Sequence, residues 1–288
     1  MNILVTTDGS ERSACILPHA AALARAVGAR LVLGRVLDPR SDAAGVTAER
    51  LAAAVAEVRT RWDAELRTLL EVHDIDGEPR VIERRWGEDV PAAIHRAADE
   101  LGAVLIAMAS RGTGAIRHAV FGSVTMGVLG RADLPVMTLS GCPPVTPHEG
   151  PYHLLITSDG SPDARSVFPA LAPLLVPGRV RVTLVEVVVM RALETEPEAK
   201  ARALPGLEAL RPRIPAGVEV AYHLPVVPPG AGIDTAIIEA AKELGADAIA
   251  SATHGHSARR HLIAGSTALG VARLAPVPVI LVKSAPVD

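Results

Sequence analysis

The sequence predicts an α/β protein of two tandem domains, each with a five-stranded parallel sheet and helices on both faces. Three observations lead to this prediction. Short apolar runs alternate with amphipathic helical patterns along the whole chain. The pattern of the first half recurs in the second half. Of the 288 residues 49% are hydrophobic but only 2% are aromatic, which favours aliphatic parallel strands buried under Ala-rich helices.

The repeat is clearest in two motifs. Residues 2–10 (Asn-Ile-Leu-Val-Thr-Thr-Asp-Gly-Ser) match residues 153–161 at an offset of 151, and residues 109–123 match residues 252–266 at an offset of 143. In the second motif Gly112 or Gly255 is followed by nine residues, a second glycine and a serine. A period of domain size indicates a tandem duplication. We therefore expect domains at 1–141 and 151–288, joined by a linker at 142–150 that is rich in proline and glycine.

Each repeat is expected to contain five strands in the order βαβαβαβαβ. Strands alternating with helices predict an open parallel sheet. The apolar runs of the first repeat place its strands at 3–7, 31–36, 80–85, 104–109 and 135–139, and those of the second at 154–157, 180–188, 218–224, 248–252 and 277–282.

The helices lie between these runs. Apolar residues share one face before each of Gly28, Gly102 and Gly245, and glycine commonly ends a helix. Pro18 and Pro169 fall inside the first helix of each repeat, where proline removes a hydrogen bond, so we expect a shared kink. A long uninterrupted helix is expected over 47–72, and a helix over about 196–210 is expected to be interrupted at its Pro-Gly pair.

Composition and charge exclude several classes of protein. The formal net charge of −3 gives no broad basic field, which argues against nucleic-acid binding. The N-terminus lacks a signal-peptide pattern, and no 18-residue apolar run predicts a membrane span, so we expect a cytoplasmic protein. Cys15 and Cys142 lack metal-ligand spacing; we expect no disulfide, with Cys15 packing as a small hydrophobe.

Two loops follow strand ends and carry chemistry suited to a nucleotide. In open parallel sheets, ligands bind beyond the carboxyl ends of the strands. If strands one and four are neighbours, Asp8 faces Gly112 and Gly122 there. A carboxylate accepts hydrogen bonds from a ribose or an adenine amine, and the N–H groups at the helix start after Gly122 suit phosphate oxygens. The alternative is a purely structural role, in which Asp8 only caps the first helix and Gly122-Ser123 only forms a turn.

Catalytic motifs are missing from the sequence. It contains neither Gly-x-x-x-x-Gly-Lys-Ser/Thr nor Gly-x-Ser-x-Gly, and no carboxylate pair stands in the motif loops. We therefore predict no catalytic residues and no metal site, with nucleotide hydrolysis slow at most.

The doubled glycine motif, the Val-Thr-Thr-Asp-Gly-Ser start and the closing Leu-Pro-Val-Met-Thr-Leu resemble the universal stress protein family in its tandem, two-domain form. The resemblance covers nearly the whole chain. It implies the adenine-nucleotide alpha-hydrolase-like fold, with strand order 3-2-1-4-5, and pairing of the two halves through their last strands as a pseudo-dimer. Further homodimerisation stays open.

The resemblance also implies ATP as the ligand, with any Mg²⁺ carried by the nucleotide. Asp8 and Asp159 would lie on the adenosine side, and Val36 and Val187 would touch adenine. The glycines and the helix starts would line the ribose and phosphate path. The implied nucleotide contacts are Asp8, Val36, Ala109, Gly112, Gly122, Ser123, Val124 and Thr125 in the first repeat, and Asp159, Val187, Ala252, Gly255, Gly265, Ser266, Thr267 and Ala268 in the second.

One departure from the family motif keeps an alternative open. The first glycine of the family's ATP-binding motif is Ala109 in one repeat and Ala252 in the other. If that position needs a positive φ or a very close approach of the ribose, nucleotide binding weakens. The alternative function is then a stress protein that acts through protein partners without a nucleotide. A third, weaker interpretation is a nucleotide-dependent enzyme on the same fold.

Overall fold

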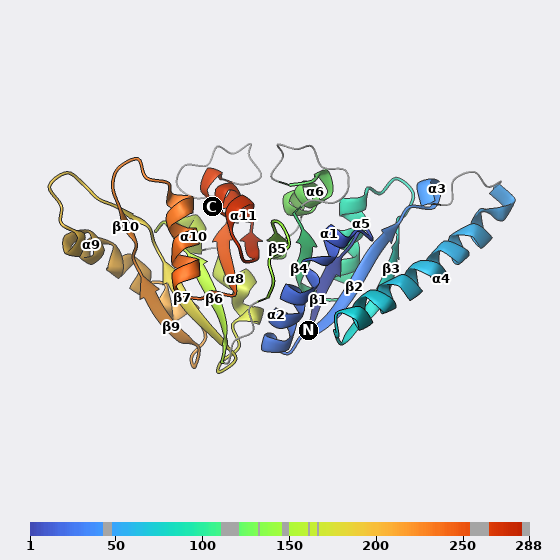
Figure 1. Cartoon of the computed structure of the whole chain (residues 1–288), viewed down its shortest axis with the longest axis horizontal. Helices are drawn as coiled ribbons and strands as arrows, with labels where there is room; N and C mark the ends of the chain where they lie inside the picture. The colour runs from blue at the N-terminus through green and yellow to red at the C-terminus, as the bar shows by residue number, and fades with distance from the viewer. Residues whose placement is uncertain are drawn as a thin grey trace. The chain divides into compact units, whose positions relative to one another are not determined.

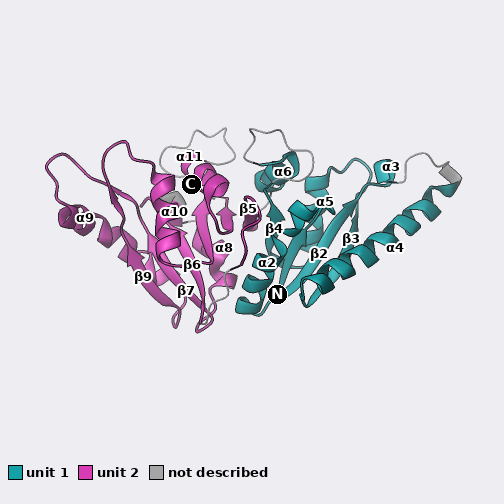
Figure 2. Ribbon diagram, viewed as in Figure 1, with its two compact units in different colours: residues 1–132 teal, residues 133–288 magenta. Residues whose placement is uncertain are grey.

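The computed structural model describes residues 1–42, 48–110, 121–131, 133–145, 150–160, 162–165, 167–253 and 265–283. The chain divides into two compact units, Met1–Ala132 and Asp133–Asp288 (Figure 2). Among the described residues, no helix is long and apolar enough to cross a membrane.

Unit 1 is built on four parallel strands in the order β3-β2-β1-β4 (Figure 1). Right-handed crossovers place α2 and α4 on one face and α5 and α6 on the other. The strands are β1 (Asn2–Thr6), β2 (Arg30–Leu37), β3 (Gly77–Glu83) and β4 (Ala103–Ala109). The helices are α1 (Glu11–Ala14), α2 (Leu17–Val27), α3 (Pro39–Asp42), α4 (Ala48–Val72), α5 (Val90–Glu100) and α6 (Ser123–Arg131).

Unit 2 holds a parallel sheet in the order β9-β7-β6-β11-β12, which is the 3-2-1-4-5 arrangement of the second repeat. Its strands are β6 (Tyr152–Thr157), β7 (Val180–Val185), β9 (Glu219–His223), β11 (Ala248–Ala252) and β12 (Val279–Val282), with a small parallel pair β8 (Val188–Val189) and β10 (Val226–Val227). The helices are α7 (Pro162–Arg165), α8 (Val167–Leu171), η1 (Ala172–Leu174), α9 (Glu196–Glu208), η2 (Arg211–Arg213), α10 (Ile233–Glu243) and α11 (Ser266–Leu274).

The last strand of the first repeat, β5 (Val136–Leu139), falls within unit 2 and pairs antiparallel with β12. The register joins Val136 to Leu281 and Thr138 to Val279. The predicted α/β fold and the tandem architecture are confirmed. The domain limits 1–141 and 151–288 and the linker at 142–150 remain predictions.

The core is aliphatic, as the composition predicts. Ile3, Leu4 and Val5 of β1 are fully buried on both faces of the sheet. Helix α2 buries an apolar stripe against the sheet, in which Leu17, Ala20, Leu23 and Ala24 are almost fully buried. Gly28, Gly102 and Gly245 have φ of 71°, 57° and 61°, so the predicted helix ends use the left-handed conformation that glycine adopts without strain.

Three local predictions are wrong. Pro18 stands in the first turn of α2, after a break between α1 and α2, and therefore interrupts no helical hydrogen bond. The helix α9 continues through Pro205 to Glu208, held at its start by a capping box of Thr195 and Glu198. Cys15 and Cys142 are both disulfide-bonded, so Cys15 is not simply a small packing residue.

Candidate functional site

A cavity of about 440 Å³ opens in unit 1 at the carboxyl ends of β1, β2 and β4. Strand register explains its position, because Thr6 at the end of β1 pairs with Gly34 of β2 and with Met108 of β4. The structure brings together seven residues that the sequence places in separate motifs. The predicted residues that line this cavity are Asp8, Val36, Ala109, Gly122, Ser123, Val124 and Thr125.

The loop after β1 is organised by its own side chains. Asp8 accepts hydrogen bonds at Oδ1 from the Ser10 amide (3.0 Å) and hydroxyl (2.6 Å). Ser10 Oγ in turn accepts from the Ser13 amide and is the N-cap of α1. The helix cap is therefore Ser10, while Asp8 is exposed at the cavity and orients the cap.

The second glycine of the motif closes its loop. The Gly122 amide donates to the Ser110 carbonyl (2.8 Å), which ties the start of α6 to the end of β4. The Gly122 carbonyl accepts the first helical hydrogen bond, from the Met126 amide (3.0 Å). The Thr125 hydroxyl donates to the Ala109 carbonyl (3.2 Å). The first amides of α6 are thereby held at the cavity, where helix N–H groups and the helix dipole attract anions.

Unit 2 contains a matching cavity of about 320 Å³. Its loop closes in the same way, with the Gly265 amide donating to the Thr253 carbonyl (2.5 Å). Gly265 is the N-cap of α11 and supplies no side-chain cap, so the first turn of this helix presents uncapped amides. The predicted residues that line this cavity are Asp159, Val187, Ala252, Gly265, Ser266, Thr267 and Ala268. Gly112 and Gly255 lie outside the described residues.

The two alanines that depart from the family motif occupy ordinary strand backbone. Ala109 is the last residue of β4 and Ala252 the last residue of β11. Neither is among the described residues with positive φ. The backbone at these positions does not require glycine, so the need for a positive φ does not apply. Each alanine lines its cavity, so its methyl group would still meet a closely approaching ribose.

Arg35 and Trp62 are among the side chains of the first cavity that sequence reasoning missed. The Arg35 guanidinium lies 3.7 Å from the centre of the Trp62 ring and donates to Glu65 at 2.8 Å. Trp62 is only 7% exposed. The signals that could have found them were an arginine beside Val36 in an apolar strand and one of only two tryptophans in the chain.

The two cavities differ in charge. Arg35 corresponds to Glu186 at the offset of 151, and each of these residues lines its own cavity. The described lining of the first cavity contains Arg35, Asp8 and Asp42, whereas that of the second contains Asp159 and Glu186 and no arginine or lysine. Nowhere in the described parts of the chain do three or more His, Cys, Asp or Glu side chains gather in a way that could hold a metal ion.

Comparison with known proteins agrees with this architecture. A universal stress protein from Archaeoglobus fulgidus DSM 4304 superposes with a TM-score of 0.67 at 23% identity, covering 99% of this chain and 98% of that one. A Pseudomonas aeruginosa UCBPP-PA14 protein assigned to the same family superposes with a TM-score of 0.58 at 15% identity, covering 98% and 93%. At these identities the likeness establishes the fold. No curated protein matches the chain.

The family itself follows from the sequence match. The model of the universal stress protein family matches residues 1–140 and again residues 152–283, which together make up most of the chain. With two matched repeats and a fold shared over the full length, this chain belongs to the universal stress protein family.

Proposed function

We propose that this protein binds ATP at the cavities of its two repeats and serves in a cytoplasmic stress response or in signalling. One observation carries the proposal. In each repeat the strand-one aspartate, the strand-two valine and the glycine–helix motif line one cavity, although they are far apart in sequence. Their chemistry fits a nucleotide: an apolar wall, a carboxylate at one side and helix amides at the other.

The lining residues fit the separate parts of ATP. Val36 and Val187 are half-buried apolar side chains suited to a base. The first turns of α6 and α11 each supply a serine hydroxyl and free helical amides suited to phosphates. Any Mg²⁺ would enter with the nucleotide. Binding rather than turnover is proposed, so phosphate release from ATP should not exceed background over hours.

Calorimetry with ATP tests the proposal. Gly265 has φ −66° and ψ 158°, which valine adopts readily, so Gly265→Val fills the cavity without backbone strain. Wild type should release heat on binding, and Gly122→Val and Gly265→Val should each lose their own site. Gly130→Ala is the matched control, since a Cβ at Gly130 would have no neighbouring atom within 4 Å and Gly130 does not line the cavity. Equal heats in all proteins would reject binding at these cavities, and no heat in any protein would reject ATP binding.

We further propose that the first cavity binds ATP more tightly than the second. The Arg35 guanidinium lines the first cavity and the Glu186 carboxylate lines the second, so the triphosphate of ATP meets opposite charges at matched positions. Arg35→Glu should lower the ATP affinity of the first site by about tenfold. Glu186→Arg should raise the ATP affinity of the second site by about tenfold. An unchanged affinity in both variants would show that this position does not set the asymmetry.

The alanine methyl groups favour a second candidate, a family member that acts through protein partners without ATP. Ala109 and Ala252 place methyl groups at the cavity walls where the family motif has glycine. Absorbance of adenine nucleotide released from the denatured, purified protein would count against this candidate.

The antiparallel pairing of β5 with β12 supports the proposal that the halves associate through their last strands. Whether two chains associate further is measured by sedimentation.

A further inference from the structure

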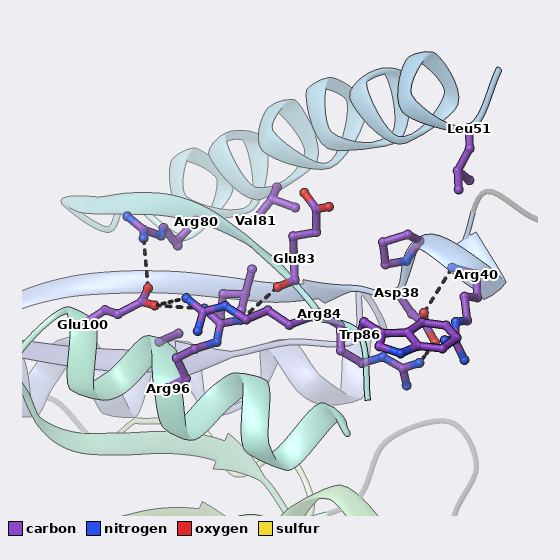
Figure 3. Close-up of a pocket in the computed structure, with 14 residues that line it drawn as sticks. Asp38, Arg40, Leu51, Arg80, Val81, Glu83, Arg84, Trp86, Arg96 and Glu100 are labelled. Carbon is purple, nitrogen blue, oxygen red and sulfur yellow. Dashed lines mark hydrogen bonds and ion pairs between the residues drawn. The ribbon is translucent and has the colours of Figure 1, made fainter. Parts of the chain in front are cut away.

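A second and larger cavity, of about 690 Å³, lies in unit 1 along the outer edge of β3, between α4 and α5 (Figure 3). It shares no lining residue with the cavity at the ends of β1 and β4. Its volume is typical of sites for small molecules. Nothing in the proposed ATP binding uses it.

An exposed tryptophan forms one wall of this cavity. Trp86 is 87% exposed, although tryptophan is usually buried and the chain has only two. One face of its ring is covered by the Arg40 guanidinium, 3.5 Å from the ring centre (Figure 3). With so much of the indole exposed, its other face is accessible for stacking against a flat ligand.

Five arginines line the cavity against three carboxylates. The arginines are Arg40, Arg80, Arg84, Arg85 and Arg96, and the carboxylates are Asp38, Glu83 and Glu100. A single carboxylate, Glu100, is shared by Arg80 (3.7 Å), Arg85 (3.2 Å) and Arg96 (3.0 Å). The cavity wall therefore carries an excess of positive charge, which favours an anionic ligand.

The arginine beside α5 is fixed in place. Arg96 pairs with Glu88 at 2.9 Å and donates to the Glu83 carbonyl at 2.9 Å. The hydrogen bond from Arg96 also lowers the pKa of Glu88 below its usual range. On the other side Arg84 pairs with Asp38 at 2.9 Å, with both side chains about one-fifth exposed. These pairs fix Arg84 and Arg96, whereas the Arg85 side chain, paired with Glu100, is 67% exposed, and the exposed Arg40 lies over the Trp86 ring.

The second repeat shows that the fold does not need this set of side chains. Gly87 and Gly230 have φ of 77° and 86°, so the turn after the strand is the same in both repeats. At the offset of 143, Arg84-Arg85-Trp86 become Val227-Pro228-Pro229, and Arg96 becomes Glu239. There the corresponding strand ends are apolar, and Val188 packs with Ala199 and Ala203. The left-handed glycine after the strand therefore does not depend on the arginines or the tryptophan of the first repeat.

We propose that this edge cavity binds a small anion that carries a flat aromatic group. The ring stacks on the open face of Trp86, and the phosphate or carboxylate group is neutralised by Arg85 and Arg40. A phosphate and a carboxylate share this chemistry, and comparison of an aryl phosphate with an aryl carboxylate separates them.

Calorimetry of the full chain with 1-naphthyl phosphate tests this proposal. We expect one site per chain in the edge cavity, and Gly122→Val and Gly265→Val should retain it because they alter the other cavities. Trp86→Ala and Arg85→Ala should each weaken binding by about tenfold or more. Both side chains are exposed, so the variants should fold, which circular dichroism verifies. Arg67→Ala is the matched control, an exposed arginine of α4 paired with Asp63 away from the cavity.

Three further probes define what the site recognises. Inorganic phosphate and 1-naphthol should each bind more weakly than 1-naphthyl phosphate, since each lacks one of the two groups. 1-Naphthoate in place of the phosphate reports which anion is preferred. Absence of binding, equal binding by Trp86→Ala, or equal binding of 1-naphthol would each overturn the proposal. ATP binding is measured separately, so the two proposals fail independently.

Discussion

Two glycines in one helix should respond in opposite directions to the same substitution. A Cβ at Gly127 of α6 would lie 2.5 Å from Cγ and 3.0 Å from Cβ of Pro91, in the first turn of α5. A Cβ at Gly130, three residues on, meets nothing within 4 Å. The proline ring is rigid and cannot turn aside, so Gly127→Ala must push α6 away from α5 by about 1 Å to reach ordinary contact distances.

The magnitudes follow from these contacts. Overpacking of this kind costs about 1–3 kcal/mol, and alanine in a helix recovers up to about 1 kcal/mol. We therefore expect Gly127→Ala to lower the free energy of unfolding by about 1–2 kcal/mol and Gly130→Ala to raise it by about 0.5–1 kcal/mol. Because α6 begins at the first cavity, the displaced helix should also weaken ATP binding in Gly127→Ala alone.

Tryptophan fluorescence during urea unfolding provides the assay. Both tryptophans, Trp62 and Trp86, belong to unit 1, and Trp62 is buried, so the signal reports this unit separately from unit 2. With a slope of about 2 kcal/mol per molar urea, the midpoints of the two variants should differ by about 1 M. Equal midpoints, or a more stable Gly127→Ala, would refute the close packing of α5 on α6.

Three further predictions follow from other contacts. Gly9→Ala should lose about 1–2 kcal/mol of stability and some ATP affinity, since Gly9 has φ +85° and its Cβ would lie 2.8 Å from the Arg35 guanidinium; urea unfolding checks this. Burial, followed by the charge of Arg181, lowers the pKa of His153. Because the unfolded chain then takes up the proton first, the free energy of unfolding should fall as the pH drops below about 6.5. The urea midpoint of unit 2 between pH 7 and 5, compared with that of His153→Gln, tests this. The hydrogen bond from Arg96 lowers the pKa of Glu88 in the folded protein. The contribution of Glu88 to stability should therefore be complete above about pH 4.5 and be lost as the pH falls through the lowered pKa. Glu88→Gln should show no such loss between pH 5 and 3.

The strands were predictable because their signals are local. A parallel strand buried on both faces is a continuous apolar run, and β1, β4 and β11 lie within about a residue of the predicted limits. The glycine helix ends were predictable for the same reason. Proline was less informative, because its effect depends on where a helix starts. Pro18 is harmless in a first turn, and α9 tolerates Pro205 close to its end.

The first cavity was predictable only in part. The repeated motif and the family resemblance supplied residues that the structure gathers around one space. They did not supply Trp62, which reaches the cavity from the middle of α4, or the stacking of Arg35 upon it. Helix periodicity indicates that Trp62 faces inward, but which strand it meets depends on how α4 crosses the sheet.

The sequence by itself determined the duplication, the strand and helix pattern and the family, since these are recorded in local patterns and in motifs that occur twice. The tertiary structure decided which side chains share a space. Arg35 and Glu186 differ in charge at matched places, and Arg40, Arg85, Trp86 and Arg96 converge on one edge from three elements. Such convergence depends on strand order and crossover direction, which join residues that no local pattern connects.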